Sequence, residues 1–252
     1  MFVRNERSIK EFMQLYPVVA WIIIIQLVLW FLTGFLHTPL GRLIENWGMG
    51  VNFYISQGEY WRLLTSIFLH AGLMHVLFNS FALVLFGPAL EQMLGKLKFL
   101  AAYLGAGLIG NLATLLLGPA LYSHVGASGA IYGLFGIYVF MVAFRKHLID
   151  QSSAQIITVI LVIGLVVTFL RSGINVYAHV FGFIGGFAIA PLVLENVRPY
   201  NPWVRRQHTD DGSIQFNPDR WQKKHRNKKI LKNSLWIFLG ILVVLGLFSR
   251  LF

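Results

Sequence analysis

Long runs of apolar residues dominate the pattern of this chain, and charged residues, glycine or proline separate them. No Asp, Glu, Lys or Arg occurs between Lys98 and Arg145, a stretch long enough for two membrane-spanning helices of about 20 residues each. Continuous runs favour helices over a β-barrel, whose strands would appear as short segments of alternating hydrophobicity. The pattern predicts seven spans, at residues 17–37, 63–87, 99–118, 128–144, 155–170, 174–194 and 234–249.

The composition agrees with a membrane protein. The chain is 56% hydrophobic and 12% charged with a mean hydropathy of +0.65, whereas soluble domains carry about 25% charged residues. The predicted fold class is all-α: a polytopic membrane helical bundle with six core helices and a seventh, C-terminal transmembrane helix. The first run lacks an A-x-A-like cleavage site, so we expect it to remain as a helix. The absence of cysteine excludes disulfides, thiolate nucleophiles and cysteine-ligated metals.

Basic residues indicate the orientation in the membrane. If the spans alternate in direction, 17 of the 21 Lys and Arg residues fall on the side of the N-terminus and four on the other. The positive-inside rule then predicts a cytoplasmic N-terminus and, after seven spans, an outer C-terminus. The expected parts are an N-terminal segment (1–16), a six-helix core (17–194), a basic cytoplasmic loop (195–233) and a seventh helix with a short tail (234–252). The loop could bind nucleic acid or anionic lipid, but a simple positive anchor explains it, and we expect no nucleic-acid partner.

Polar residues within the spans form three clusters, and such residues are functional candidates because they are costly in lipid. His75 and Asn79 stand four residues apart, so they share one face of the second span. Ser128 and Tyr132 share a face of the fourth span. His179 lies about five residues into the sixth span, and alternating topology places all three groups towards the outer membrane side.

Glycines accompany two of these clusters. Gly126, Gly129 and Gly133 would keep the surface around Ser128 thin enough for a substrate backbone to approach. Gly182 and Gly186 follow His179 at i+3 and i+7, which allows another helix to pack closely against that face.

The clusters predict nucleophilic catalysis. An imidazole can accept the proton of a serine hydroxyl, which makes Ser128 the candidate nucleophile and His179 its base. Asp150 and the later aspartates fall on the cytoplasmic side, so a dyad is expected, with Tyr132 stacked on the imidazole. His75, Asn79 and the Ser128 N–H are candidate donors to an oxyanion.

Other interpretations remain open. Ser128 and His179 could meet only to satisfy each other, and Asn111 and Asn175 are better explained as helix-packing residues. A histidine metal site is conceivable, but no HExxH motif or acidic ligand supports it, so we expect no metal and no cofactor. The segment GASGA is not the G-x-S-x-G elbow of α/β hydrolases.

The motifs resemble those of the rhomboid family of intramembrane serine proteases. They are GASG at Gly126–Gly129 with Tyr132, HAGLMHVLFN at His70–Asn79, AHVFGFIGG at Ala178–Gly186, and the first-loop pair Trp61–Arg62. The resemblance implies Ser128 as nucleophile, His179 as general base, His75 and Asn79 as oxyanion donors, and a first loop, residues 38–62, in the outer interface. It also implies transmembrane protein substrates cut in or near their membrane segments.

The resemblance to bacterial-type members predicts an integral protein of a bacterial plasma membrane, in contact with its lipid bilayer. A catalytically inactive relative that binds transmembrane clients is the leading alternative, which the presence of both Ser128 and His179 disfavours. A transporter or channel is disfavoured because no carboxylate is expected within the spans. The oligomeric state is not predicted.

Overall fold

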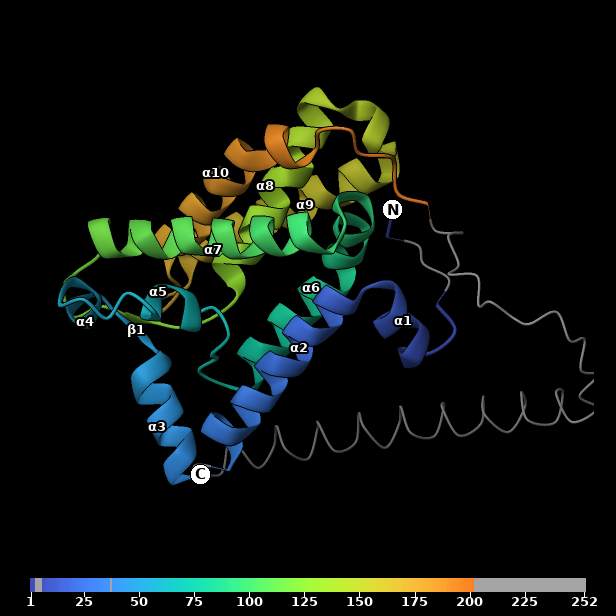
Figure 1. The fold of residues 1–252 in the computed structure, drawn as a ribbon. Coiled ribbons are helices and arrows are strands. Elements are labelled where there is room, and N and C mark those ends of the chain that lie inside the picture. Colours follow the sequence, from blue (N-terminus) through green and yellow to red (C-terminus); the bar gives the residue numbers. More distant parts are fainter. Residues whose placement is uncertain (3–5, 37, 202–252) are drawn as a thin grey trace, which may run out of the picture. The chain divides into compact units, whose positions relative to one another are not determined.

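Helices make up nearly all regular structure in the computed structural model, which describes residues 1–2, 6–36 and 38–201 (Figure 1). The expected seventh span, residues 234–249, and residues 202–233 of the expected basic loop lie outside the described residues. The shorter elements are α1 (Ile9–Leu15), α3 (Pro39–Gly48), β1 (Gly50–Val51), α4 (Asn52–Ser56), α5 (Arg62–Thr65), β2 (Ser123–His124) and the 3₁₀-helix η2 (Lys146–Leu148).

Five of the described helical segments are long and apolar enough to cross a membrane. They are α2 (Pro17–Trp30) with the π-helix η1 (Phe31–Phe35), α6 (Leu73–Leu94), α7 (Lys96–Leu117), α9 (Gln151–Leu170) and α10 (Val176–Val193). A sixth apolar helix, α8 (Ser128–Phe144), has 17 residues and is about 25 Å long, less than the roughly 30 Å of a hydrocarbon core. The predicted fold class, a membrane bundle of helices, is confirmed.

The second span differs from its predicted range of 63–87. Residues 62–65 form the separate short helix α5, residues 66–72 form a connection, and α6 begins only at Leu73. The apolar side chains within residues 63–69 lead to the prediction that the spanning helix begins there. Leu63, Ile67 and Leu69 are instead apolar because they are buried against other parts of the protein. His70 therefore lies in a connection and not in a span.

The expectation of no carboxylate within the spans is wrong. Because α6 continues through Gly87 and Pro88 to Leu94, Glu91 lies inside a spanning helix and is buried. Its two carboxylate oxygens accept hydrogen bonds from the backbone N–H groups of Val18 and Val19 at 2.9 and 2.8 Å. These N–H groups lie in the first turn of α2, where a backbone N–H has no acceptor within the helix. Glu91 therefore caps α2, which runs beside α6 (Figure 1).

Helices α7, α8 and α10 make the most extensive contacts, and glycines let their backbones approach closely. A Cβ added to Gly133 of α8 would collide with the Ala106 side chain of α7 and lie 3.1 Å from the carbonyl oxygen of Gly182 on α10. A Cβ added to Gly186 would collide with the Gly133 carbonyl oxygen. Any larger residue at these positions would force the helices apart.

The first loop contains α3, β1, α4 and α5, and Arg62 holds it together. The Arg62 side chain is buried, donates to the carbonyl oxygens of Asn46 and Met49 at 2.7 Å each, and pairs with Glu59 at 2.6 Å. β1 pairs antiparallel with β2, which fixes the loop to the segment just before Ser128. Exposed aromatic residues on this loop suit a membrane–water interface: Trp47, Phe53, Tyr54, Tyr60 and Trp61.

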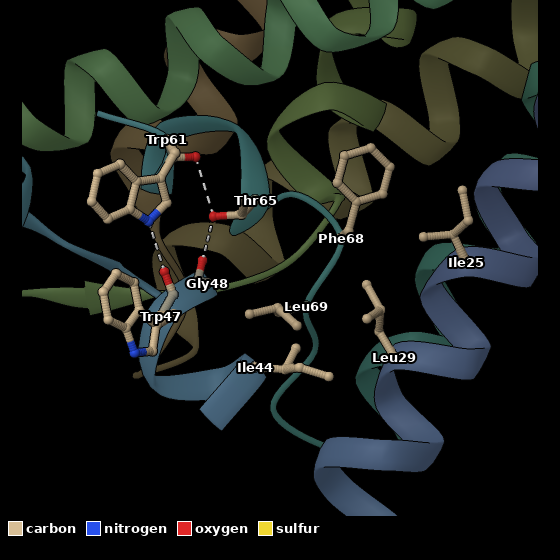
Figure 2. Close-up of a pocket in the computed structure, with 9 residues that line it drawn as sticks. All are labelled: Ile25, Leu29, Ile44, Trp47, Gly48, Trp61, Thr65, Phe68 and Leu69. Carbon is tan, nitrogen blue, oxygen red and sulfur yellow. Dashed lines mark hydrogen bonds between the residues drawn. The ribbon is translucent and has the colours of Figure 1, made fainter. Parts of the chain in front are cut away.

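An apolar pocket of about 460 Å³ lies between the first loop, α2 and the segment that leads to α6 (Figure 2). Ile25 and Leu29 of α2 form one wall. Two polar side chains in its lining bond to backbone groups of other lining residues, since Thr65 donates to the Gly48 carbonyl and the Trp61 indole donates to the Trp47 carbonyl. None of the candidate catalytic residues lines this pocket.

Candidate active site

Ser128 and His179 meet between α8 and α10. The Ser128 Oγ and His179 Nε2 atoms are 2.7 Å apart, a hydrogen-bond distance. Ser128 is the first residue of α8 and is half-buried, whereas His179 is 8% exposed. Because α8 is shorter than a hydrocarbon core is thick, its first residue can lie below the membrane surface.

Close packing of α8 on α10 sets the distance between these two residues. A Cβ added to Gly129, which follows Ser128, would lie 3.1 Å from the carbonyl oxygen of Ala178, which precedes His179. A Cβ added to Gly182 would collide with the Gly129 carbonyl oxygen. Four of the expected glycines, Gly129, Gly133, Gly182 and Gly186, therefore lie at the interface of α8 and α10.

Gly126 brings the segment before Ser128 against His75. Its φ is 129°, a conformation that favours glycine, and an added Cβ would lie 2.6 Å from His75 Nε2 and 3.8 Å from Ser128 Oγ. The Gly126 N–H donates to the Ser66 carbonyl at 2.9 Å, which holds the segment in place. The structure thus brings His75 beside the candidate nucleophile Ser128.

Asn79 lies one turn after His75 on α6 and is 6% exposed. Within the described part of the chain its Nδ2 group has no hydrogen-bond acceptor. The Ser128 N–H lies in the first turn of α8, where backbone N–H groups have no partner within the helix and the helix dipole is positive. Both groups are donors that could bind an oxyanion.

Tyr132 stacks on the His179 ring, as the sequence predicted. The ring centroids are 4.2 Å apart and the planes differ by 19°. Tyr132 lies one turn after Ser128 on α8, so the same helix carries the candidate nucleophile and a support for its candidate base.

Thr168 is a site residue that the sequence reasoning missed. Its Oγ1 atom lies 2.8 Å from His179 Nδ1 and 3.0 Å from the Tyr132 hydroxyl oxygen, and the side chain is 1% exposed. The available signal was a threonine within the apolar last part of α9, four residues after Gly164. Both ring nitrogens of His179 are therefore occupied, one by Ser128 and one by Thr168.

The packing roles expected for two asparagines are confirmed. Asn111 of α7 donates to the Leu63 carbonyl at 2.8 Å, and Asn175 donates to Thr114 at 3.0 Å while capping α10. Asp150 caps the first turn of α9, at the opposite end of that helix from Thr168.

Two further histidines lie close in sequence to the site residues, His70 in the connection before α6 and His124 in β2. His70 and His124 are buried, and neither ring has a hydrogen-bond partner among the described residues. Burial, with a smaller contribution from the charge of His75, lowers the pKa of His70 to about 3, and burial lowers the pKa of His124 to about 4. No three His, Asp or Glu side chains come together as metal ligands in the described ranges.

Comparisons with known proteins identify the family. The sequence model of the Rhomboid domain matches residues 57–196. The rhomboid relative YdcA of Bacillus subtilis (strain 168) is 46% identical over 197 residues, which are 77% of this chain and 97% of YdcA. The rhomboid protease GluP of the same organism is 41% identical over 143 residues, 57% of this chain and 28% of GluP. RHOMBOID-like protein 1 of Arabidopsis thaliana is 29% identical over 210 residues, 82% of this chain and 52% of that protein. The chain therefore belongs to the rhomboid family of membrane proteases.

Proposed function

We propose that this protein is an intramembrane serine endopeptidase that hydrolyses peptide bonds in or near transmembrane segments of membrane proteins, with Ser128 and His179 as a catalytic dyad. The 2.7 Å distance between Ser128 Oγ and His179 Nε2 is the observation that carries the proposal. A serine hydroxyl needs an adjacent base to become a useful nucleophile, and a neutral imidazole at this distance is such a base.

The proposed reaction begins when Ser128 Oγ attacks the substrate carbonyl carbon and His179 Nε2 takes the hydroxyl proton. The carbonyl oxygen becomes an oxyanion that accepts hydrogen bonds from the Ser128 N–H, Asn79 Nδ2 and His75. His179 then returns the proton to the leaving amine as the peptide bond breaks, which leaves an acyl ester on Ser128. Water, deprotonated by His179, hydrolyses that ester and regenerates the hydroxyl.

The proposal differs from a Ser-His-Asp triad because the second imidazole nitrogen meets a hydroxyl. His179 Nδ1 contacts Thr168, so no carboxylate occupies that position. Stacking on Tyr132 supplies a further restraint on the ring. A histidine held on two sides loses less freedom on reaching the transition state.

The substrates we propose are membrane proteins whose transmembrane segment locally unwinds. A helix has all its backbone groups paired internally, so a peptide carbonyl reaches Ser128 only in an extended stretch. The glycines near Ser128 do not themselves provide that space, because Gly126 packs against His75, and Gly129 and Gly133 pack against α10.

The proposed setting is a bacterial plasma membrane with a cytoplasmic N-terminus and an outer C-terminus. The parts are then a cytoplasmic segment (1–16), the six-helix core (17–194), a basic cytoplasmic loop (195–233) and a seventh helix with an outer tail (234–252). The concentration of Lys and Arg in the first and third of these parts supports this orientation. The active site would then face the outer half of the bilayer.

Cleavage of a single-span model substrate in liposomes tests the proposal. The wild type, Ser128→Ala and His179→Ala are compared, with Ser123→Ala as the control because that serine is exposed on β2. We expect one cut near the outer membrane boundary by the wild type and the control, and none by the two dyad variants. Cleavage that persists in Ser128→Ala would overturn the dyad, and substrate binding without cleavage by the wild type would favour a client-binding protein.

A further inference from the structure

We propose that Thr168 is a positioning residue that fixes the tautomer of His179, so that Nδ1 carries the ring proton and Nε2 is left free to accept the proton of Ser128. This inference rests on the proposed function for its catalytic consequence. The hydrogen-bond arrangement itself is independent of any activity.

Four hydroxyl or ring hydrogens meet at this cluster, and their count selects one arrangement. The Thr168 hydroxyl lies 2.7 Å from the carbonyl oxygen of Gly164, which can only accept, so Thr168 donates its single hydrogen there. The Thr168 oxygen then accepts from its other neighbours, which are His179 Nδ1 at 2.8 Å and the Tyr132 hydroxyl at 3.0 Å.

A neutral imidazole carries one proton, so a protonated Nδ1 leaves a lone pair on Nε2. That lone pair accepts from the Ser128 hydroxyl at 2.7 Å. In this arrangement the hydrogens of Thr168, His179, Tyr132 and Ser128 all lie in observed hydrogen bonds. With the other tautomer, Nε2–H would point at Ser128 Oγ, and the serine hydrogen would lose its acceptor.

The location of Thr168 suits a positioning role. One oxygen atom joins three helices, since Thr168 lies on α9, Tyr132 on α8 and His179 on α10. α9 approaches Tyr132 closely at Gly164, where an added Cβ would lie 2.7 Å from the Tyr132 hydroxyl. Many apolar side chains of α9 are exposed on the protein surface, as expected for a helix that faces lipid. Gly164 and Thr168 are positions at which α9 instead contacts Tyr132 of the candidate site.

Three variants test the inference. Thr168→Val keeps the shape and removes the hydroxyl, whereas Thr168→Ser keeps the hydroxyl. The matched control is Thr158→Val, because Thr158 lies on the same helix, donates to the Ala154 carbonyl at 2.9 Å in the same way and is exposed. Thermal midpoints in detergent verify that each variant is folded.

The first measurement is ¹⁵N NMR of protein labelled at histidine, recorded at pH 8, where a histidine of ordinary pKa is neutral. The signals of His179 are identified by their loss in His179→Gln. We expect the Nδ1–H tautomer in the wild type, in Thr168→Ser and in Thr158→Val, and a mixture in Thr168→Val. An Nε2–H tautomer in the wild type would overturn the inference whether or not the protein cleaves anything.

The second measurement is the kinetics of substrate cleavage. We expect Thr168→Val to lower kcat by about 10²-fold with KM within about twofold, because removal of the orienting carboxylate in serine proteases costs about 10⁴-fold and a neutral hydroxyl is a weaker partner. Thr168→Ser should retain at least about a third of wild-type kcat. Equal losses in the Val and Ser variants would show that only shape matters and would contradict the inference, whereas activity that survives Ser128→Ala would refute the proposed dyad instead.

Discussion

Substitution of Gly182 by alanine should separate Ser128 and His179, the two residues of the proposed dyad, without altering either of them. The new Cβ would lie 2.9 Å from the carbonyl carbon of Gly129 and closer still to its oxygen. Ordinary contacts between carbon atoms are about 3.5–4.0 Å, so α8 and α10 must move apart by roughly 0.6–1.1 Å. Gly129 follows Ser128 directly and Gly182 is one turn from His179, so most of this movement reaches the dyad.

The expected Ser128–His179 distance is then about 3.5 Å, compared with 2.7 Å in the wild type. That exceeds a useful hydrogen-bond length, and a misplacement of about 1 Å can cost 10²-fold in rate. The stability cost of about 1–3 kcal/mol for overpacking is partly offset by up to about 1 kcal/mol of helix propensity. The protein should therefore fold and cleave about 10²-fold more slowly.

The assay is kcat for a single-span substrate, measured beside the thermal midpoint. Gly105→Ala is the control, because Gly105 lies on α7 and an added Cβ there meets no atom within 4 Å. We expect the control to cleave at the wild-type rate. A Gly182→Ala variant within twofold of wild-type kcat would refute the argument that glycine contacts set the dyad distance.

Other residues support further predictions. Asn79→Ala should lower kcat by about 10²–10³-fold if the proposed oxyanion donor is lost with it. Ser80→Ala, at a buried neighbour on α6, should leave kcat within twofold, and equal effects of the two substitutions would contradict the proposed role of Asn79. Arg62→Lys should lower the free energy of unfolding by about 2–4 kcal/mol in a reversible unfolding assay. The reason is that an ammonium group cannot reproduce the hydrogen bonds that the Arg62 guanidinium donates to Glu59 and to the Asn46 and Met49 carbonyls. An unchanged free energy of unfolding would contradict this prediction. His70 and His124 should destabilise the protein in acid, since their folded pKa values lie below the unfolded value of about 6.5. Above about pH 6.5 both histidines are neutral in the folded and unfolded states, and the free energy of unfolding has its full value. As the pH falls below 6.5 towards 4, protonation of the unfolded state lowers the free energy of unfolding, by about 2 kcal/mol for each histidine at pH 5. Thermal midpoints at pH 7.5 and 5.0 measure this loss, which His124→Gln should reduce; an unchanged loss in that variant would contradict the assignment.

The fold class was predictable because lipid imposes a simple requirement on sequence. Each membrane helix must present about 20 apolar residues, and that signal survives without any knowledge of packing. The start of α6 was not predictable in the same way. Residues 63–69 contain an apolar run, but Leu63, Ile67 and Leu69 are buried against other parts of the protein. Hydrophobicity does not distinguish such burial from exposure to lipid.

The candidate site was largely predictable from spacing within helices. Ser128 and Tyr132 share a face because they are one turn apart, and the topology places the start of α10 beside them. Thr168 could not be placed in this way, because its contacts depend on the rotation of α9 about its axis. That rotation is set by packing at Gly164, and a lone threonine near the end of an apolar run carries no periodic signal. Glu91 was missed for a related reason, since its role depends on the start of α2 lying beside the end of α6.

Covalent labelling of Ser128 tests the central claim most directly. The wild type, His179→Ala and Ser123→Ala are treated with a fluorophosphonate, and the modified peptide is located by mass spectrometry. The dyad predicts one adduct, on Ser128, that forms in the wild type and in Ser123→Ala but is at least about 10²-fold slower in His179→Ala. An adduct on another residue, or equal labelling rates with and without His179, would contradict it.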